Sequence, residues 1–150
     1  MPWMMFVGLL IVVLVAAIGI VWWRVWHRKR ALQLLIRRGH SITDTQVAAA
    51  MAALGAAAPA ASLPVADVWG HGIMAFAYTV ADPQAKLTRA AVAAALSEQA
   101  QAAGFTPLSP RYAPFEVTDW WQRGGETHFD VAYVANAATS EYVGDVAKVS

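Results

Sequence analysis

WMMFVGLLIVVLVAAIGIVWW, residues Trp3 to Trp23, contains 21 consecutive residues without one ionisable side chain. As a helix rising about 1.5 Å per residue, this stretch is roughly 31 Å long, close to the thickness of a bilayer's hydrocarbon core. A signal peptide would have a basic segment before its apolar core and small residues after it. Here no basic residue precedes Arg24, and the stretch ends in two tryptophans. We therefore expect a single transmembrane helix rather than a signal peptide or the buried helix of a soluble core.

The residues that flank this stretch predict its orientation. Aromatic rings favour the headgroup level of a bilayer, and basic residues close to a span favour its cytoplasmic side. All nearby basic residues follow the span, so we expect the N-terminus outside the cell membrane and the C-terminal domain in the cytoplasm, with the cations against anionic headgroups. The expected membrane-interface residues are Trp3, Trp22, Trp23, Trp26, Arg24, Arg28, Lys29 and Arg30.

The charge of the chain is unevenly distributed. Residues 1–38 carry six basic side chains and no acid, whereas residues 39–150 carry five basic and ten acidic ones, a net charge of −5 with His neutral. A net-acidic domain argues against a nucleic-acid partner. The chain has no cysteine, which excludes disulfides, thiolate metal sites and a cysteine nucleophile.

The residues after the span predict a helical hairpin neck. Apolar side chains at helical spacing over residues 32–36 extend the first helix to the end of the 1–38 segment. Gly39 is typical of a helix end. Thr43, with Gln three residues later, forms a capping box that predicts a second helix within residues 39–55, folded back on the first.

The remainder of the chain predicts a small α+β domain. Residues 56–64, AAAPAASLP, are expected to be an uncharged linker before a domain over residues 65–150. Alternating side chains over 73–80 predict a strand covered on both sides, and 88–103 a helix capped by its first residue. The tail, 142–149, is expected to add a short strand. Together with the hairpin described next, the order is β-α-β-β(β), a helix on an antiparallel sheet.

A β-hairpin is predicted from two alternating segments, residues 115–122 and 126–135. Gly124-Gly125 between them is a typical two-residue hairpin turn. With this turn, Val117 should lie opposite Ala132, Asp119 opposite Asp130 and Trp121 opposite His128.

One face of this hairpin carries the candidate metal site. The same register places Asp119 opposite Asp130 and Trp121 opposite His128. Two carboxylates and an imidazole can bind a divalent metal ion or perform acid–base chemistry. The alternative is an exposed face with solvated charges, or a different register, and no cofactor is expected.

Two other histidines, His40 and His71, are expected to be structural. His40 follows the expected helix end at Gly39, where the helix dipole favours a partial positive charge. His71 lies between two glycines and is typical of a polar turn residue.

The domain carries no nucleophile elbow, phosphate loop, dinucleotide fingerprint or zinc-protease pattern. Tryptophan is enriched where proteins bind one another. We therefore expect a non-catalytic, single-pass membrane-anchored protein-interaction module, an accessory or assembly subunit bound to another membrane or membrane-associated protein. The alternatives are a membrane-tethered metal-binding or hydrolytic domain, or a sensor or immunity-type binding protein. The expected interface residues are Trp120, Trp121, Trp69 and Tyr112.

Overall fold

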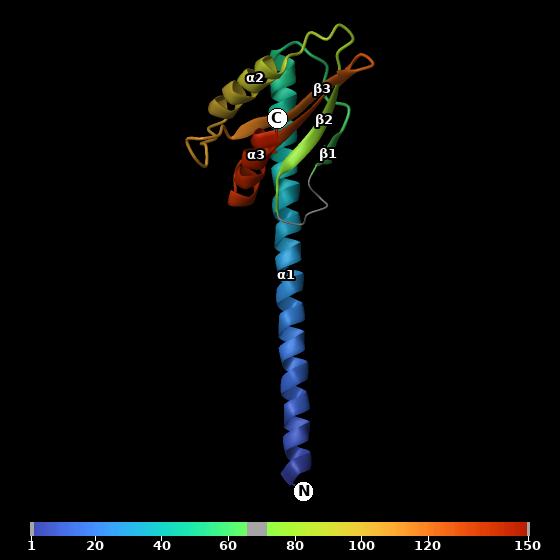
Figure 1. The fold of residues 1–150 in the computed structure, drawn as a ribbon, viewed down its shortest axis with the longest axis vertical. Helices are drawn as coiled ribbons and strands as arrows, with labels where there is room; N and C mark the ends of the chain where they lie inside the picture. The colour runs from blue at the N-terminus through green and yellow to red at the C-terminus, as the bar shows by residue number, and fades with distance from the viewer. Residues whose placement is uncertain (1, 66–71, 150) are drawn as a thin grey trace. The chain divides into compact units, whose positions relative to one another are not determined.

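The computed structural model describes residues 2–65 and 72–149, and the chain forms two compact units, Met1–Leu35 and Ile36–Ser150 (Figure 1). The first element, helix α1, extends from Pro2 to Ala53 and therefore contributes residues to both units.

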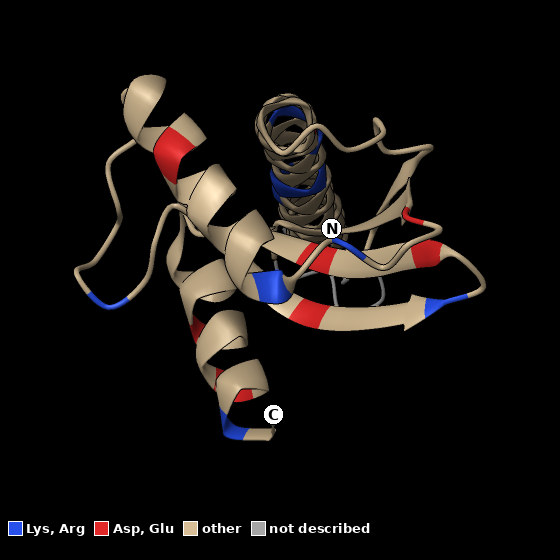
Figure 2. Ribbon diagram, turned by 90° about the horizontal axis from the view of Figure 1, so that it is seen from above, with Lys and Arg blue, Asp and Glu red and all other residues tan. Residues whose placement is uncertain are grey.

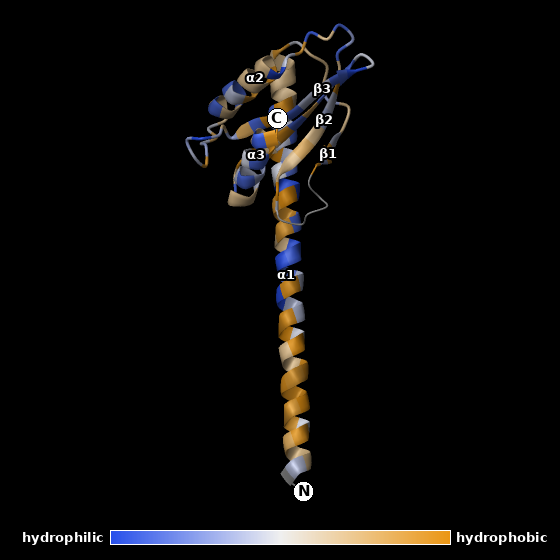
Figure 3. Ribbon diagram, viewed as in Figure 1, coloured by the Kyte–Doolittle hydropathy of each residue, from blue (hydrophilic) through white to orange (hydrophobic). Residues whose placement is uncertain are grey.

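The first unit is the N-terminal part of α1. Every large apolar side chain from Trp3 to Trp26 is at least 44% exposed. Among the described residues, α1 is the one helix long and apolar enough to cross a membrane. Figure 3 shows its apolar character as an almost continuous hydrophobic colour along the N-terminal part of the helix. The prediction of one long, apolar N-terminal helix is confirmed.

The predicted hairpin neck is wrong, because α1 continues without a break through Gly39 to Ala53. The missing side chain of Gly39 makes room for a neighbour: an ideal Cβ there would lie 2.5 Å from Sδ of Met74. Thr43, predicted to begin a new helix, instead donates its hydroxyl to the Gly39 carbonyl within the same helix, at 2.7 Å. Gly39 and Thr43 therefore both lie inside one continuous helix, with Gly39 packed against Met74.

The second unit contains a four-stranded antiparallel sheet in the order β1-β2-β4-β3. The α+β class, the central strand, the helix and the hairpin are confirmed (Figure 1). The elements are β1 Ser62–Pro64, β2 Ala75–Ala81, α2 Arg89–Ala102, β3 Phe115–Arg123, β4 Glu126–Tyr133 and α3 Ala137–Val149.

Local signals set the ends of two of these elements. Thr88 is the N-cap of α2, and its side chain accepts a hydrogen bond from the Ala91 N–H at 3.2 Å. Gly124 and Gly125 both have positive φ angles, 64° and 79°, as a tight turn between two twisted strands requires.

Two other predictions are wrong. Part of the predicted linker is the short edge strand β1, which pairs with β2 so that Ser62 lies opposite Tyr78. The tail forms helix α3 instead of a strand. Its first turn is capped by Asn136, whose Oδ1 accepts from the Thr139 N–H at 2.8 Å, and the buried residues Thr139 and Val143 are four apart, on one face of the helix.

The core lies on one face of the sheet, called here the inner face. The C-terminal part of α1 and helix α2 cover this face together. The other face is called the outer face. Within the described parts of the chain, it is covered at one end, where α3 packs Val143 against Ala75 and Ala132. The largest fully buried side chains of the inner core are Tyr78, Phe76, Phe129, Met51, Met74, Leu96, Val47, Val80, Val92 and Val131.

The register of the hairpin is correct near the turn and wrong at its far end. Asp119 pairs with Asp130 and Trp121 with His128, as predicted. Val117, however, lies opposite Val131 and not Ala132, because the register shifts between Val117 and Asp119. The extra residue in β3 is a β-bulge, which allows Val117 to stay in the core.

Candidate functional site

The uncovered part of the outer face gathers most of the functional residues predicted in the domain. Three rows of side chains cross strands β2, β4 and β3 on this face, as the registers of the two strand pairs define. They are Ala77, Asp130 and Asp119; Thr79, His128 and Trp121; and Ala81, Glu126 and Arg123. Figure 2 shows acidic residues on both long strands of the hairpin.

The central row is an ordered aromatic pair. The rings of Trp121 and His128 stack with centroids 3.6 Å apart and an angle of 4° between their planes. Nδ1 of His128 lies 3.0 Å from the Thr79 hydroxyl, and Nε2 lies 3.5 Å from a carboxylate oxygen of Glu126. These contacts fix the imidazole under the indole, while Trp121 remains 47% exposed. The result is a flat, pre-ordered aromatic surface.

The next row places two carboxyl groups opposite each other. Burial raises the pKa of Asp130, and the facing carboxylate of Asp119 raises it further. Asp119 is exposed and accepts a hydrogen bond from the Trp120 N–H at 2.8 Å. Within residues 2–65 and 72–149, neither carboxylate forms an ion pair. This row therefore carries negative charge that the described part of the chain leaves uncompensated.

The three predicted metal ligands share a face but do not form a metal centre with one another. Across the described residues, no group of three or more His, Asp or Glu side chains lies close enough to hold a metal ion. Both ring nitrogens of His128 face Thr79 and Glu126 instead of the two aspartates. The three side chains therefore lie on one face without converging on a common point.

The other predicted interface residues have different environments. Trp120 is half-buried against the inner core, where its ring stacks on Phe129 with centroids 5.6 Å apart. Tyr112 is half-buried beside the apolar residues that α3 covers on the outer face, with the Arg111 guanidinium 5.3 Å from its ring centroid. Trp69, like His71, lies outside the described residues. Of the predicted set, Trp121 is the one whose described environment leaves a large ring surface open.

A polar network that the sequence did not predict joins α1, β1 and β2. Asp44 Oδ1 accepts hydrogen bonds from the hydroxyls of Ser62 and Tyr78, each at 2.8 Å. Ser62 Oγ also contacts Nε2 of His40, whose ring stacks on Phe76 at 4.4 Å. Burial and the bond to Asp44 raise the pKa of Tyr78, so its hydroxyl stays protonated and donates.

The geometry of this network differs from that of an activated serine. Ser62 donates its hydroxyl to Asp44, and Asp44 lies against the same His40 nitrogen, Nε2, that contacts Ser62. An activated serine requires the reverse arrangement, with the imidazole accepting the proton and the carboxylate on its other nitrogen. The network instead fastens the three-residue strand β1 to the long helix.

The spacing of His40 and Asp44 in the sequence indicates this network only if the helix continues past Gly39. His40 and Asp44 are four residues apart and lie on one face of a continuous helix, where their side chains are 3.5 Å apart. Because glycine is typical of helix ends, the sequence predicts that the helix stops at Gly39 and that His40 lies in a turn, away from that face.

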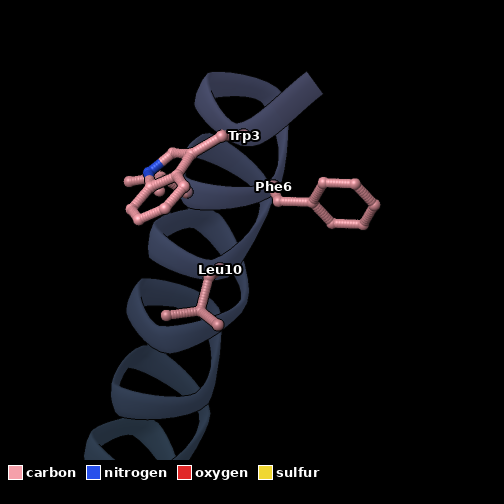
Figure 4. Close-up of a pocket in the computed structure, with 4 residues that line it drawn as sticks. Trp3, Phe6 and Leu10 are labelled. Atoms are coloured by element: carbon pink, nitrogen blue, oxygen red, sulfur yellow. The ribbon is translucent and has the colours of Figure 1, made fainter. Parts of the chain in front are cut away.

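The predicted membrane-interface residues all lie in the first unit. Trp3, Trp22, Trp23 and Trp26 are exposed on α1, and the Arg30 guanidinium lies 5.1 Å from the Trp26 ring centroid. A shallow hollow near the N-terminal end of the helix is lined, among the described residues, by Trp3, Phe6, Val7 and Leu10, and Figure 4 shows Trp3, Phe6 and Leu10 projecting from the helix.

Comparison with protein-family models, with curated proteins and with solved structures finds no match to this chain. The function is therefore inferred from the chain's own residues.

Proposed function

We propose that this protein is a single-pass, membrane-anchored protein-interaction module. Its N-terminal helix anchors it in the cell membrane, and its cytoplasmic domain binds another membrane or membrane-associated protein as a non-catalytic accessory or assembly subunit. The observation that carries this proposal is the exposed ring of Trp121, which stacks on His128 on the part of the outer face that α3 does not cover.

The exposed apolar side chains of the N-terminal helix support its role as a membrane anchor. An apolar helix of this length, exposed on all sides, would be costly in water but is the natural element of a bilayer. Lipid chains would fill shallow hollows such as the one at Trp3 and Phe6. Aromatic residues at both ends of the apolar stretch suit the two headgroup regions.

The orientation follows from the basic residues that come after the stretch and is tested with a cysteine. The chain has no natural cysteine, so Ser150→Cys introduces a single thiol. In intact cells this thiol should resist a membrane-impermeant maleimide and react after the cells are permeabilised. Rapid labelling in intact cells would reverse the proposed topology.

The stacked Trp121 ring and the neighbouring carboxylates support the role of the outer face as an interaction surface. A tryptophan that is already held by stacking loses little side-chain entropy when a partner covers it. The neighbouring carboxylates of Asp119 and Asp130 have no cation partner in the described part of the chain. Buried aromatic anchors beside a polar rim are the usual composition of binding hot spots.

Site-specific photo-crosslinking tests this surface in cells. A photoreactive phenylalanine analogue in place of Trp121 should yield a discrete crosslinked band, because this position would lie at the centre of the interface. The same analogue at Glu98, an exposed residue of α2, serves as the matched control and should yield none. A strictly monomeric particle in mild detergent, without any adduct from position 121, contradicts the proposal.

A further inference from the structure

A pocket lies at the edge of the sheet that is formed by strand β3. Strand β3 is at the edge of the sheet, and a hollow of about 250 Å³ opens beside its bulge, between the start of α2 and helix α3. We call this hollow the edge pocket. It is lined by Arg89, Tyr112, Glu116, Val117, Thr118, Val143, Val146 and Ala147.

The bulge leaves a buried polar atom at this pocket. Thr118 is 5% exposed, and its Oγ1 has no hydrogen-bond partner of good geometry among the described residues. The Tyr142 hydroxyl comes close enough for Thr118 to lower the pKa of that tyrosine, but burial outweighs this and raises it. A buried hydroxyl whose polar neighbour, the Tyr142 hydroxyl, offers no bond of good geometry costs free energy, and a hydrogen bond from Thr118 to a ligand in the pocket would recover part of it.

Two charged side chains border the same hollow. The Arg89 guanidinium donates one hydrogen bond to the Val117 carbonyl at 2.8 Å, which positions the group and leaves its other donors available. Glu116 accepts at Oε1 from the Ala113 N–H at 2.6 Å, which leaves its second oxygen available. The cation, the anion and the hydroxyl thus line one pocket whose remaining walls are largely aliphatic.

We propose that the edge pocket binds a small aliphatic α-amino acid, of which valine is a suitable example. Arg89 and Thr118 donate hydrogen bonds to its carboxylate. Glu116 accepts from its ammonium group. Val143 and Val146 contact its side chain. This proposal is independent of the protein-interaction function, because Trp121 does not line the pocket.

Equilibrium dialysis of the full chain in phosphatidylcholine nanodiscs tests the ligand class. Radiolabelled L-valine should bind saturably, after subtraction of binding to empty nanodiscs. Isovalerate lacks the ammonium group and isobutylamine lacks the carboxylate, so each should compete at least about tenfold more weakly, since each loses a charge-assisted hydrogen bond. Isovalerate that competes as well as valine, or the absence of saturable binding at millimolar valine, would overturn the proposal.

Two substitutions connect this binding to the pocket. Arg89→Leu should weaken valine binding by about tenfold or more, and Arg89→Lys should restore part of it. The control Arg123→Leu makes the same change at an exposed residue of β3 outside the pocket and should leave binding unchanged.

Thr118→Val separates binding from folding. It keeps the shape of the side chain and removes a hydroxyl that makes no good hydrogen bond, so hydrogen exchange should show a domain as stable as the wild type or more so. Valine binding should nevertheless fall several-fold. The exposed loop substitution Thr106→Val is the control and should change neither property. Wild-type affinity in Thr118→Val would overturn the proposal.

Discussion

The two parts of helix α1 have the same backbone structure and opposite surroundings. Large apolar side chains from Trp3 to Trp26 are at least 44% exposed, whereas Val47, Ala50 and Met51 are completely buried in the core. A helix satisfies its backbone hydrogen bonds internally in either case. What differs is the apolar material that covers its side chains: protein for the second part and, in our proposal, lipid for the first. Four predictions test this difference, beginning with the largest expected effect.

Met51→Asp should unfold the domain, because it places a charge at a fully buried position in the core. An unpaired buried charge costs roughly 3–5 kcal/mol or more, a large part of a domain's stability. Hydrogen exchange of the full chain in nanodiscs should show loss of protection in β2 and β4. The neighbouring exposed residue gives the control: Ala52→Asp should keep wild-type protection.

Val13→Asp should impair membrane insertion and leave the domain folded. A charged residue at the centre of a span costs about 2.5–3.5 kcal/mol in insertion. Carbonate extraction of membranes should release more of this variant than of the wild type. Gln33→Asp, beyond the apolar stretch, is the control and should remain in the membrane fraction. Equal extraction of both variants would contradict the assignment of this part of the helix to the bilayer.

Gly39→Val should destabilise the domain by about 1–3 kcal/mol, the usual cost of overpacking. The added side chain would collide with Met74, since even a Cβ would lie 2.5 Å from its sulfur. The opening free energy of β2 in native-state hydrogen exchange measures this effect. At Gly19 nothing lies within 4 Å of an added Cβ, so Gly19→Val should leave the domain unchanged.

Thr43→Val should have the smallest effect, a loss of about 1 kcal/mol in the same measurement. Its hydroxyl is fully buried and donates to the Gly39 carbonyl. Thr45 makes the equivalent bond to the Ser41 carbonyl at 2.9 Å but is exposed, so water can replace that bond. Thr45→Val should therefore change stability by less than about 0.5 kcal/mol. Equal losses in the two variants would show that burial of Thr43 does not matter.

The candidate surface was predictable as far as it depends on local geometry. A two-residue Gly124-Gly125 turn aligns the nearby residues, so the pairs Asp119–Asp130 and Trp121–His128 follow from the sequence. Which nitrogen of His128 faces which oxygen depends on Thr79, from a strand far away in the chain. For this reason the sequence placed three possible ligands on one face but could not decide whether they converge.

The sequence by itself determined the features that neighbouring residues complete among themselves. The apolar stretch needs only its own composition to become a membrane-length helix, and Thr88 caps α2 through a bond to a residue three positions away.

Only the tertiary structure decided the features that depend on distant partners. Met74 occupies the space that Gly39 leaves, so a residue typical of helix ends lies inside a helix. Ser62 reaches Asp44 and His40, so part of an apparent linker becomes a strand. The bulge at Thr118 keeps Val117 in the core and opens the edge pocket. Each of these outcomes follows from packing and hydrogen bonds between segments far apart in the sequence, where a free-energy gain of a few kcal/mol overrides a weak local preference.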